Sequence, residues 1–274
     1  MVWKYILFSL GIGVLSIFLF EYFFQKDVEK TTIDSLDLFF KPKNTIGPYP
    51  SKIINLSNWK ITLPIGTEKK PKYPLEIRQP ELNEYRLDPW FSLTPEKDGV
   101  VFRAPVNAPT TGNTKYARSE LREMKDGGKN SASWSSTEGK HTMILDQAVT
   151  AIPKVKQHVV AGQIHDSEDD VIVIRLEYPN LYVNVDGENE YVLDANYTLG
   201  KRFTVKFVAE KGKTSIYYNK QDDPVYVLDL DYSEAYFKAG VYTQSNCKTE
   251  EDKKYCQSDN YGEVILYNVE VIHI

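Results

Sequence analysis

The sequence predicts an all-β fold, a jelly-roll β-sandwich of two antiparallel sheets, preceded by an N-terminal hydrophobic signal or anchor segment. Aromatic residues, which favour strands, are abundant: the 274 residues include 19 Tyr and 12 Phe. Short runs of alternating apolar and polar residues recur between turn residues, and no helix longer than two turns is indicated after the N-terminal segment. These features favour two stacked antiparallel sheets over a helical fold.

The first 24 residues form the hydrophobic segment. Residues 5–20 are almost wholly apolar and follow Lys4, which is typical of a secretory signal peptide or a membrane anchor. The sequence that follows, Glu21-Tyr22-Phe23-Phe24, suits a signal peptidase poorly, so an uncleaved anchor is favoured. No cysteine follows the run, which excludes bacterial lipoprotein processing. We therefore expect an exported protein, extracellular or membrane-anchored, whose main domain lies outside the cytoplasm.

A polar linker, residues 25–51, is expected to join this segment to one domain, residues 52–274. Three prolines lie near the end of the linker, and the first apolar run of the domain begins at Ile53. Two hairpin turns are indicated, by Asp186-Gly187 and by Lys211-Gly212-Lys213. The Pro- and Thr-rich loop 105–114 is placed to overhang a site. The expected strands are residues 53–56, 59–64, 100–104, 116–123, 141–149, 157–165, 171–177, 181–185, 202–208, 214–218, 225–230, 236–244 and 263–274.

The charge and cysteine content exclude some classes of function. A net charge of −5 argues against a nucleic-acid-binding surface, so any site for an anion must be local. Cys247 and Cys256 are the two cysteines, and neither a C-x-x-C pattern nor a histidine at metal spacing accompanies them, which argues against a zinc site there. They would form a disulfide in an exported protein and remain free thiols in a cytosolic one.

The most unusual stretch is the strand expected over residues 116–123. Alternate side chains of a strand share a face, so Arg118, Glu120 and Arg122 lie together with Tyr116, while the opposite face is small and apolar. Two guanidiniums around a carboxylate are either a solvated ion pair or a preorganised site for an anionic carboxylate. This stretch alone does not decide between the two interpretations.

Two further strands carry chemically distinctive residues on one face. In the run 157–165, Gln163 and His165 are expected to share a face with Ala161, opposite Val160, Gly162 and Ile164. In the run 236–244, Gly240 is expected to leave room for a ligand in the middle of the polar face. That polar face carries Tyr236, Lys238, Gly240, Tyr242 and Gln244, opposite the apolar Phe237, Ala239 and Val241.

At these strands the sequence resembles polysaccharide lyase family 7, the alginate lyases. The strings Arg118-Ser119-Glu120-Leu121, Gln163-Ile164-His165 and Tyr236-Phe237-Lys238-Ala239-Gly240-Val241-Tyr242-Thr243-Gln244 are similar to the family's three signature motifs and follow the same order. The resemblance covers about residues 52–274, including residues 56–64 and 263–268. Thr243 departs from the family pattern, which often has Asn there, and its side chain is expected on the core side.

The resemblance implies a β-eliminating enzyme that cleaves alginate, an anionic polymer of 4-linked uronates, and leaves C4–C5 unsaturated oligosaccharides. By resemblance, Arg118 and Gln163 would neutralise the uronate carboxylate, and His165 and Tyr242 would be the acid and base. The role of Tyr242 would need a lowered pKa, supplied by Arg118 or Lys238. The Gln-Ile-His form accompanies activity on guluronate-containing stretches in this family. No metal or cofactor is required, and we expect a monomer.

The remaining site residues are assigned by position. Glu120 is expected to orient Arg118 and Arg122. For Arg175, an ordinary position on the sheet surface explains the residue as well as a functional role does. His141 and His158 have no surrounding motif. The expected substrate contacts are Arg122, Glu120, Lys238, Gln244 and Tyr236.

Three other classes of function compete with a lyase. A non-catalytic jelly-roll carbohydrate-binding module would need aromatic platforms but not the Arg, Gln, His and Tyr cluster. A glycoside hydrolase would need two positioned carboxylates, and no E-x-D-x-x-E run lies on an expected strand. The third alternative is a membrane-tethered adhesion domain.

Overall fold

The computed structural model describes residues 48–112 and 114–274, and these residues belong to one compact unit. The predicted signal or anchor segment, residues 1–24, and most of the predicted linker, residues 25–51, lie outside the described residues. Among the described residues, no helix has the length and apolar character needed to span a membrane.

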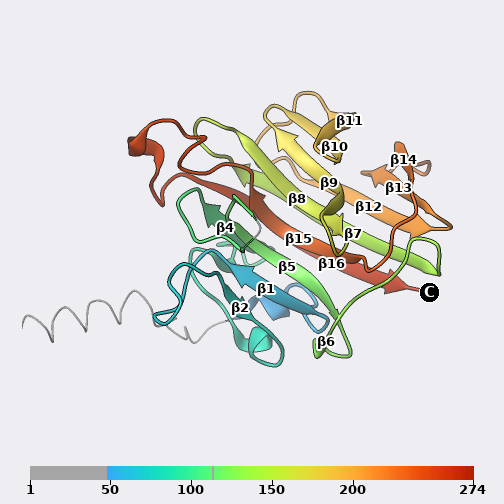
Figure 1. Cartoon of the computed structure of the whole chain (residues 1–274), viewed down its shortest axis with the longest axis horizontal. Coiled ribbons are helices and arrows are strands. Elements are labelled where there is room, and N and C mark those ends of the chain that lie inside the picture. The colour runs from blue at the N-terminus through green and yellow to red at the C-terminus, as the bar shows by residue number, and fades with distance from the viewer. Residues whose placement is uncertain (1–47, 113) are drawn as a thin grey trace, which may run out of the picture. The chain divides into compact units, whose positions relative to one another are not determined.

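Two antiparallel sheets make up the described part of the chain (Figure 1). The larger sheet has the strand order β11-β10-β9-β8-β15-β5-β1-β2, and β6 pairs with β5. Its strands are β1 (Trp59–Leu63), β2 (Leu75–Ile77), β5 (Arg118–Lys125), β6 (Asn130–Ser131), β8 (His158–His165), β9 (Asp170–Glu177), β10 (Asn180–Val185), β11 (Glu188–Asp194) and β15 (Tyr236–Thr243).

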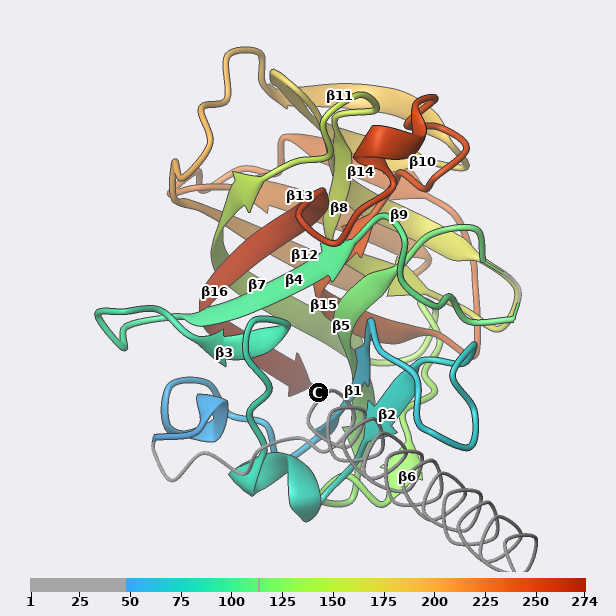
Figure 2. The same cartoon turned by 90° about the vertical axis from the view of Figure 1, so that its left-hand side faces the viewer.

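The smaller sheet has the strand order β14-β13-β12-β7-β16-β4-β3, and Figure 2 shows β4, β16 and β7 side by side in it. The helices in the described residues are three short 3₁₀ turns, so the predicted all-β class with two antiparallel sheets is confirmed. The strands are β3 (Phe91–Leu93), β4 (Val100–Pro105), β7 (Lys140–Ala151), β12 (Phe203–Glu210), β13 (Lys213–Tyr218), β14 (Tyr226–Asp229) and β16 (Tyr261–His273); the 3₁₀ turns are η1 (Pro50–Lys52), η2 (Glu81–Glu84) and η3 (Lys253–Tyr255).

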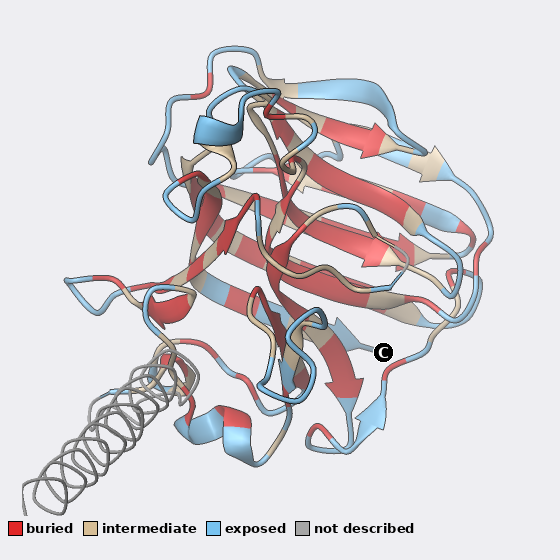
Figure 3. Cartoon of the chain, turned by 60° about the vertical axis from the view of Figure 1, so that its left-hand side comes forward, coloured by how far each residue is buried: buried red, intermediate tan, exposed pale blue. Residues whose placement is uncertain are grey.

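The hydrophobic core lies between the two sheets, where Figure 3 shows the buried stretches of the strands. Phe237, Ala239 and Val241 of β15 belong to this core, as the alternation of the sequence predicted. Thr243 is also buried and donates a hydrogen bond to the carbonyl oxygen of Ala104 on β4, at 2.8 Å. The core therefore holds β15 in a fixed orientation and turns its polar face away from the second sheet.

Some sequence-based assignments of strands were wrong or incomplete. Residues 53–56 form a turn rather than a strand, because their apolar side chains anchor a loop in the core. The strands β2, β3 and β6 are at most three residues long, too short to show an alternating pattern. The edge strand β11 was missed because its first five residues are all exposed, so burial imposes no alternation on them.

A bulge in β8 corrects the expected faces of that strand. The register against β9 shifts between Val160 and Gln163, and Gly162 within this stretch has a φ of 104°. As a result Ala161 packs in the core, whereas Val160 lies beside Gln163 in the wall of a cavity. The expectation that Ala161 shares the face of Gln163 was therefore wrong, because a bulge breaks the two-residue period of a strand.

Gly240 also has a different role from the one expected. Its φ is 120°, and a Cβ atom there would lie 2.6 Å from the carbonyl oxygen of Ser119 and 2.9 Å from the Phe102 ring. The absent side chain therefore allows close packing of β15 on β5 and on the core. It does not leave room for a ligand, so that expectation was wrong.

Candidate active site

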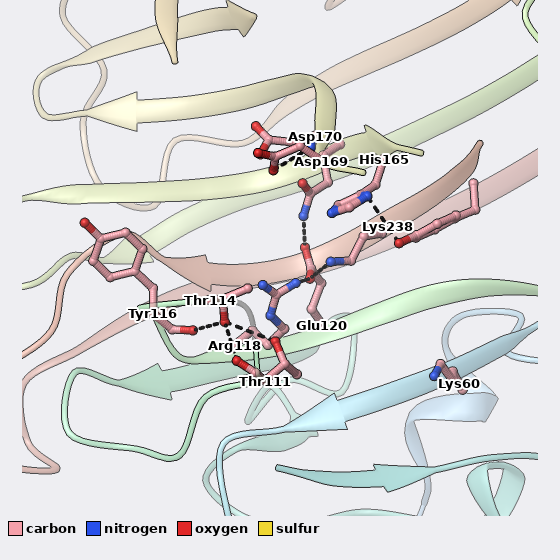
Figure 4. Close-up of polar contacts among 12 residues, drawn as sticks. Lys60, Thr111, Thr114, Tyr116, Arg118, Glu120, His165, Asp169, Asp170 and Lys238 are labelled. Atoms are coloured by element: carbon pink, nitrogen blue, oxygen red, sulfur yellow. Dashed lines mark hydrogen bonds and ion pairs between the residues drawn. The ribbon is translucent and has the colours of Figure 1, made fainter. Parts of the chain in front are cut away.

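The three motif strands are neighbours in the larger sheet, in the order β8-β15-β5. Antiparallel pairing brings together residues that lie more than a hundred positions apart in the sequence, because β15 inserts between the other two strands. Polar side chains of all three strands consequently lie close together, as Figure 4 shows for Glu120, His165 and Lys238. The directly opposed pairs are Tyr242 with Arg118, Lys238 with Arg122, Lys238 with Gln163, and Tyr236 with His165.

Glu120 is the centre of the polar cluster. Its Oε2 atom lies 2.8 Å from Nη1 of Arg118 and 2.7 Å from Nζ of Lys238, and its Oε1 atom accepts a 2.5 Å hydrogen bond from Nε2 of Gln163. Only 1% of the Glu120 side chain is exposed. Burial alone would raise the pKa of Glu120, but the positive charges of Lys238 and Arg118 outweigh it and hold this pKa below its usual range. Glu120 is therefore an ionised anchor for three side chains.

Lys238 is buried more deeply than a residue whose only role is to contact a substrate. Its side chain is 8% exposed, and burial lowers its pKa to about 8, with Glu120 opposing this shift and Arg118 adding to it. Lys238 still lines the groove described below. Its first partner is Glu120, so its ammonium group contributes to the field of the site while it remains fixed in place.

Arg118 contacts Tyr242 as well as Glu120. Its guanidinium carbon lies 4.0 Å from the centroid of the Tyr242 ring, a cation–π contact. The Nε atom of Arg118 is buried and has no hydrogen-bond partner in the protein. A buried guanidinium that keeps an unused donor is suited to bind an anionic group such as a carboxylate.

His165 has a defined tautomer. Its Nδ1 atom lies 2.7 Å from the carbonyl oxygen of Asp166, which can only accept, so Nδ1 carries the hydrogen of the neutral ring. Tyr236 stacks on the ring, and its hydroxyl oxygen is 3.2 Å from the same nitrogen. Burial and the positive charge of Lys238 lower the pKa of His165, against an opposing hydrogen bond to Asp166. The ring is consequently neutral near pH 7, with Nε2 free to accept a proton.

Tyr242 differs from the expectation in its acidity. Burial raises the pKa of Tyr242 above its ordinary value of 10.0, and the positive charge of Arg118 only partly opposes this rise. The expected lowering of this pKa was therefore wrong for the free protein, because desolvation of the phenolate is the larger effect. Tyr242 is a neutral phenol in this state and can donate a proton.

Arg122 is not held by Glu120, which corrects the expected role of that carboxylate. The guanidinium carbon of Arg122 instead lies 3.9 Å from the centroid of the Tyr236 ring, and its Nη1 atom donates to the carbonyl oxygen of Glu123 at 3.1 Å. Arg122 and Tyr236 thus support each other beside His165. Both line the same groove.

The groove runs across the strands and consists of two adjoining cavities of about 470 and 290 Å³. The larger cavity is lined by Arg118, His165 and Lys238, and the smaller one by Gln163, Tyr242 and Gln244. Thr111, Gly112 and Thr114 also line the larger cavity, so these described residues of the Pro- and Thr-rich loop lie over the site as predicted.

Sequence reasoning missed several residues of the groove. Lys60 on β1 lies opposite Arg122 and pairs with Glu76 at 2.6 Å, and its position in an alternating strand was the available signal. Asp169 lines both cavities and Asp170 lines the smaller one, where burial raises the pKa of Asp170 to about 6. Arg175 also lines the smaller cavity, but its Nε atom lies 3.0 Å from Glu177.

The described residues place no group of three or more His, Cys, Asp or Glu side chains where they could hold a metal ion. Within the groove, the available positive charge comes from Arg and Lys side chains. The two cysteines, Cys247 and Cys256, are joined in a disulfide that closes a loop after β15.

Comparison with known proteins agrees with this arrangement. A family model described as alginate lyase matches residues 54–273. The chain belongs to the alginate lyases of polysaccharide lyase family 7. It is therefore a polysaccharide lyase, and the resemblance noted from its motifs is confirmed.

Solved alginate lyase structures share the fold over most of both chains. The alginate lyase AlgAT5 from polysaccharide lyase family 7 is 48% identical, with 83% of this chain and 100% of that chain covered and a TM-score of 0.77. An alginate lyase from Corynebacterium sp. is 44% identical, with 82% and 98% covered and a TM-score of 0.77. An alginate lyase of Klebsiella pneumoniae is 27% identical, with 88% of this chain and 96% of that protein covered.

Proposed function

We propose that this alginate lyase cleaves alginate by β-elimination and favours guluronate-containing stretches. The observation that carries the proposal is the pairing of a neutral His165, with a free Nε2, and a protonated Tyr242 in one groove with Arg118 and Gln163. This set offers a base, an acid and donors for a carboxylate. A binding module would not need an acid and a base in one groove.

The chemistry requires that the uronate carboxylate be neutralised first. The proton on C5 becomes acidic only when charge can spread into the neighbouring carboxylate as the C5–H bond breaks. Arg118 has an unused buried donor, and Gln163 keeps one N–H after donating the other to Glu120. In our proposal both donate to this carboxylate, and preorganised donors of this kind stabilise the charge that develops on it.

The proton transfers follow from the protonation states of the free enzyme. Nε2 of His165 takes the C5 proton, the C5–H electron pair forms the C4–C5 double bond, and the C4–O4 bond breaks. The leaving O4 takes the hydroxyl proton of Tyr242. Exchange with water then returns a proton to Tyr242 and removes one from His165. Guluronate and mannuronate differ in configuration at C5, so the C5 proton lies on a different side of the sugar ring in each. A base and an acid on two separate side chains therefore suit one of the two uronates better than the other.

Mass spectrometry of the oligosaccharide products tests elimination. The full-length protein is incubated with alginate, and the new non-reducing ends are analysed. We expect products that are lighter by one water than the corresponding hydrolysis products. Products with the mass of hydrolysed fragments, or no products from folded protein, would reject the proposal.

We also propose that the protein is exported, with the N-terminal segment as a signal or anchor. The support is the apolar run 5–20 and the disulfide between Cys247 and Cys256, since disulfides persist mainly in oxidising compartments. Fractionation of the producing cells tests this proposal. Lyase in the medium or on the outside of a membrane supports export, and lyase confined to the cytosol contradicts it.

A further inference from the structure

The two cavities of the groove differ in their charge. Basic side chains outnumber acidic ones in the larger cavity, which is lined by Lys60, Arg118, Arg122 and Lys238 together with Glu76, Glu168 and Asp169. Acidic side chains outnumber basic ones in the smaller cavity, which is lined by Asp169, Asp170 and Asp186 together with Arg175. Arg175 is itself paired with Glu177, at 3.0 Å. A groove for a polyanion therefore carries an excess of negative charge in one of its two cavities.

Asp169 and Asp170 lie at the start of β9 and are held by the turn that joins β8 to β9. The backbone N–H of Asp169 donates to Oδ1 of Asp166 at 3.0 Å, and that of Asp170 donates to Oδ1 of Asp169 at 2.9 Å. Asp170 is directly opposite His165 in the register of the two strands. Figure 4 shows the two carboxylates next to each other, on the same side of the cluster as His165. Their position beside the reacting groups is therefore fixed by the backbone.

Neither of the two carboxylates is neutralised by a cation. The ion pairs among the described residues leave both of them out, and two cations of the groove, Arg118 and Lys238, pair with Glu120 instead. Burial, together with the hydrogen bond and the negative charge of Asp169, raises the pKa of Asp170 to about 6. Above this pH the two acids carry adjacent negative charges, which repel a carboxylate of the substrate. A sugar hydroxyl can instead donate a hydrogen bond to either of them.

A second feature of the smaller cavity also points to a ligand that donates hydrogen bonds. Asn184 on β10 lines this cavity and is only 1% exposed. Its Nδ2 atom donates to Oδ1 of Asn189 at 2.8 Å, and its own Oδ1 atom accepts no hydrogen bond from the described residues. A buried amide oxygen without a donor in the protein needs one from a ligand or from water. The cavity thus combines carboxylate and amide acceptors, which suit hydroxyl groups.

The positions of the proposed base and acid indicate which sugar the smaller cavity receives. His165 lines the larger cavity, and Tyr242 lines the smaller one. In the proposed mechanism His165 takes the C5 proton of one sugar, and Tyr242 protonates the O4 oxygen that leaves with the neighbouring sugar. The smaller cavity therefore lies on the side of the departing sugar.

We propose that Asp169, Asp170 and Asn184 determine how the departing sugar binds, by accepting hydrogen bonds from its hydroxyl groups and excluding its carboxylate from the smaller cavity. This inference rests on the function proposed above. It makes the two aspartates specificity-determining residues, whereas the acid and the base remain Tyr242 and His165. The departing sugar then binds with its carboxylate directed to solvent, and the negative charge of the cavity weakens its binding after cleavage.

Removal of one charge without a change of shape tests the exclusion of the carboxylate. The Kd of oligoguluronate is measured by calorimetry with full-length Tyr242→Phe, which binds without cleaving in the proposed mechanism, and with Tyr242→Phe carrying Asp170→Asn. At pH 7.5 we expect the second protein to bind about three- to tenfold more tightly, because a repulsive charge is lost. Asp229→Asn in the same background, on β14 of the other sheet, is the matched control and should leave the Kd unchanged.

The same comparison at pH 5 separates charge from shape. Asp170 is largely protonated there in the parent protein, so the two proteins should bind with the same affinity. The other charged or titratable groups that face Asp170 occur in both proteins: Asp169, His165, Lys238, Arg175 and Asp186. Equal affinities at pH 7.5, weaker binding by Asp170→Asn, or an equal gain at both pH values would overturn the inference.

Removal of an acceptor tests the recognition of hydroxyl groups. In the Tyr242→Phe background, folded Asn184→Ala should bind oligoguluronate about two- to tenfold more weakly, the usual effect of one lost hydrogen bond. An unchanged Kd would contradict this part of the inference. The outcome is separable from that of the proposed function. Cleavage by the wild type with no effect of Asp170→Asn would reject the inference alone, and tighter binding by Asp170→Asn with no cleavage by the wild type would reject the proposed function alone.

Discussion

Lys238 and Glu120 form an ion pair of 2.7 Å in which at most 8% of either side chain is exposed. The pair joins β15 to β5 directly under the groove, and Arg118 and Gln163 bind the same carboxylate. A buried carboxylate with three donors is stable only while its partners are in place. The positions of the proposed catalytic donors therefore depend on Glu120, which is not itself a proposed acid or base.

Replacing Glu120 should therefore damage the fold as well as the activity. Glu120→Gln leaves the charges of Lys238 and Arg118 uncompensated in a buried site, and we expect a loss of about 3–5 kcal/mol in the free energy of unfolding. Chemical denaturation measures this loss. Glu76→Gln, which breaks the more exposed pair with Lys60, should cost at most about 1 kcal/mol. Equal losses in the two variants would show that Glu120 is not a structural anchor.

The same carboxylate predicts a loss of stability in acid. The pKa of Glu120 is lowered in the folded protein, so around its unfolded value of 4.5 the unfolded chain binds more protons than the folded one. The stabilisation by Glu120 is thus complete above about pH 4.5 and is lost as the pH falls through the folded pKa. Unfolding curves between pH 3 and 6 should show a weaker pH dependence for Glu120→Gln than for the wild type. Identical slopes would contradict this assignment.

Removal of the proposed acid or base should abolish turnover without abolishing binding. We expect Tyr242→Phe and His165→Gln each to lower kcat by about 10²–10⁴-fold, the usual contribution of general acid–base catalysis, with little change in the Kd for oligoguluronate. Tyr217→Phe, on β13 of the other sheet, is the matched control and should retain full activity. Wild-type kcat in Tyr242→Phe would exclude the phenol as the acid.

The acidic side of the pH–rate profile should report His165. Burial and Lys238 lower the pKa of this imidazole below its usual 6.5, and the proposed base must be neutral. The kcat/KM for polyguluronate should therefore fall only below pH 6.5. Lys238→Met removes a positive charge that lowers this pKa, so the midpoint should move to higher pH. A wild-type midpoint above 6.5, or a shift to lower pH in the variant, would contradict the assignment.

Gly240 should tolerate no side chain. Gly240→Ala would place a Cβ against the Ser119 carbonyl oxygen in a backbone conformation with φ of 120°, so we expect a destabilisation of more than about 2 kcal/mol. Gly187→Ala is the control, because its φ is 82° but no atom lies within 4 Å of the added Cβ. It should cost about 1 kcal/mol. A smaller loss for Gly240→Ala than for Gly187→Ala would be inconsistent with the close packing.

The strand alternation predicted the faces of β5 and β15 but not those of β8. Residues 237, 239 and 241 are in the core as expected, because no bulge interrupts the pairing of β15 with β5. In β8 the bulge at Gly162 moves Ala161 to the core side. Alternation assumes a constant period, and a single sequence gives no direct sign of where the period changes.

The partners of the site residues were harder to predict than their strands. Glu120 was expected to hold Arg118 and Arg122, both close to it in sequence, but its other partners are Lys238 and Gln163. Strand order across the sheet decides such contacts, and local patterns do not contain it. The direction of the Tyr242 pKa shift likewise depends on how much of the ring is buried, which follows only from the assembled groove.

The most direct test of the proposed mechanism is ultraviolet absorbance after mixing the protein with polyguluronate and with polymannuronate. Elimination creates a C4–C5 double bond conjugated to the carboxylate, which absorbs, whereas binding and hydrolysis create no such group. We predict a steady rise with both polymers and a faster initial rate with polyguluronate. A flat trace from folded protein on both polymers would contradict the proposed lyase mechanism, and a faster rate on polymannuronate would contradict the guluronate preference.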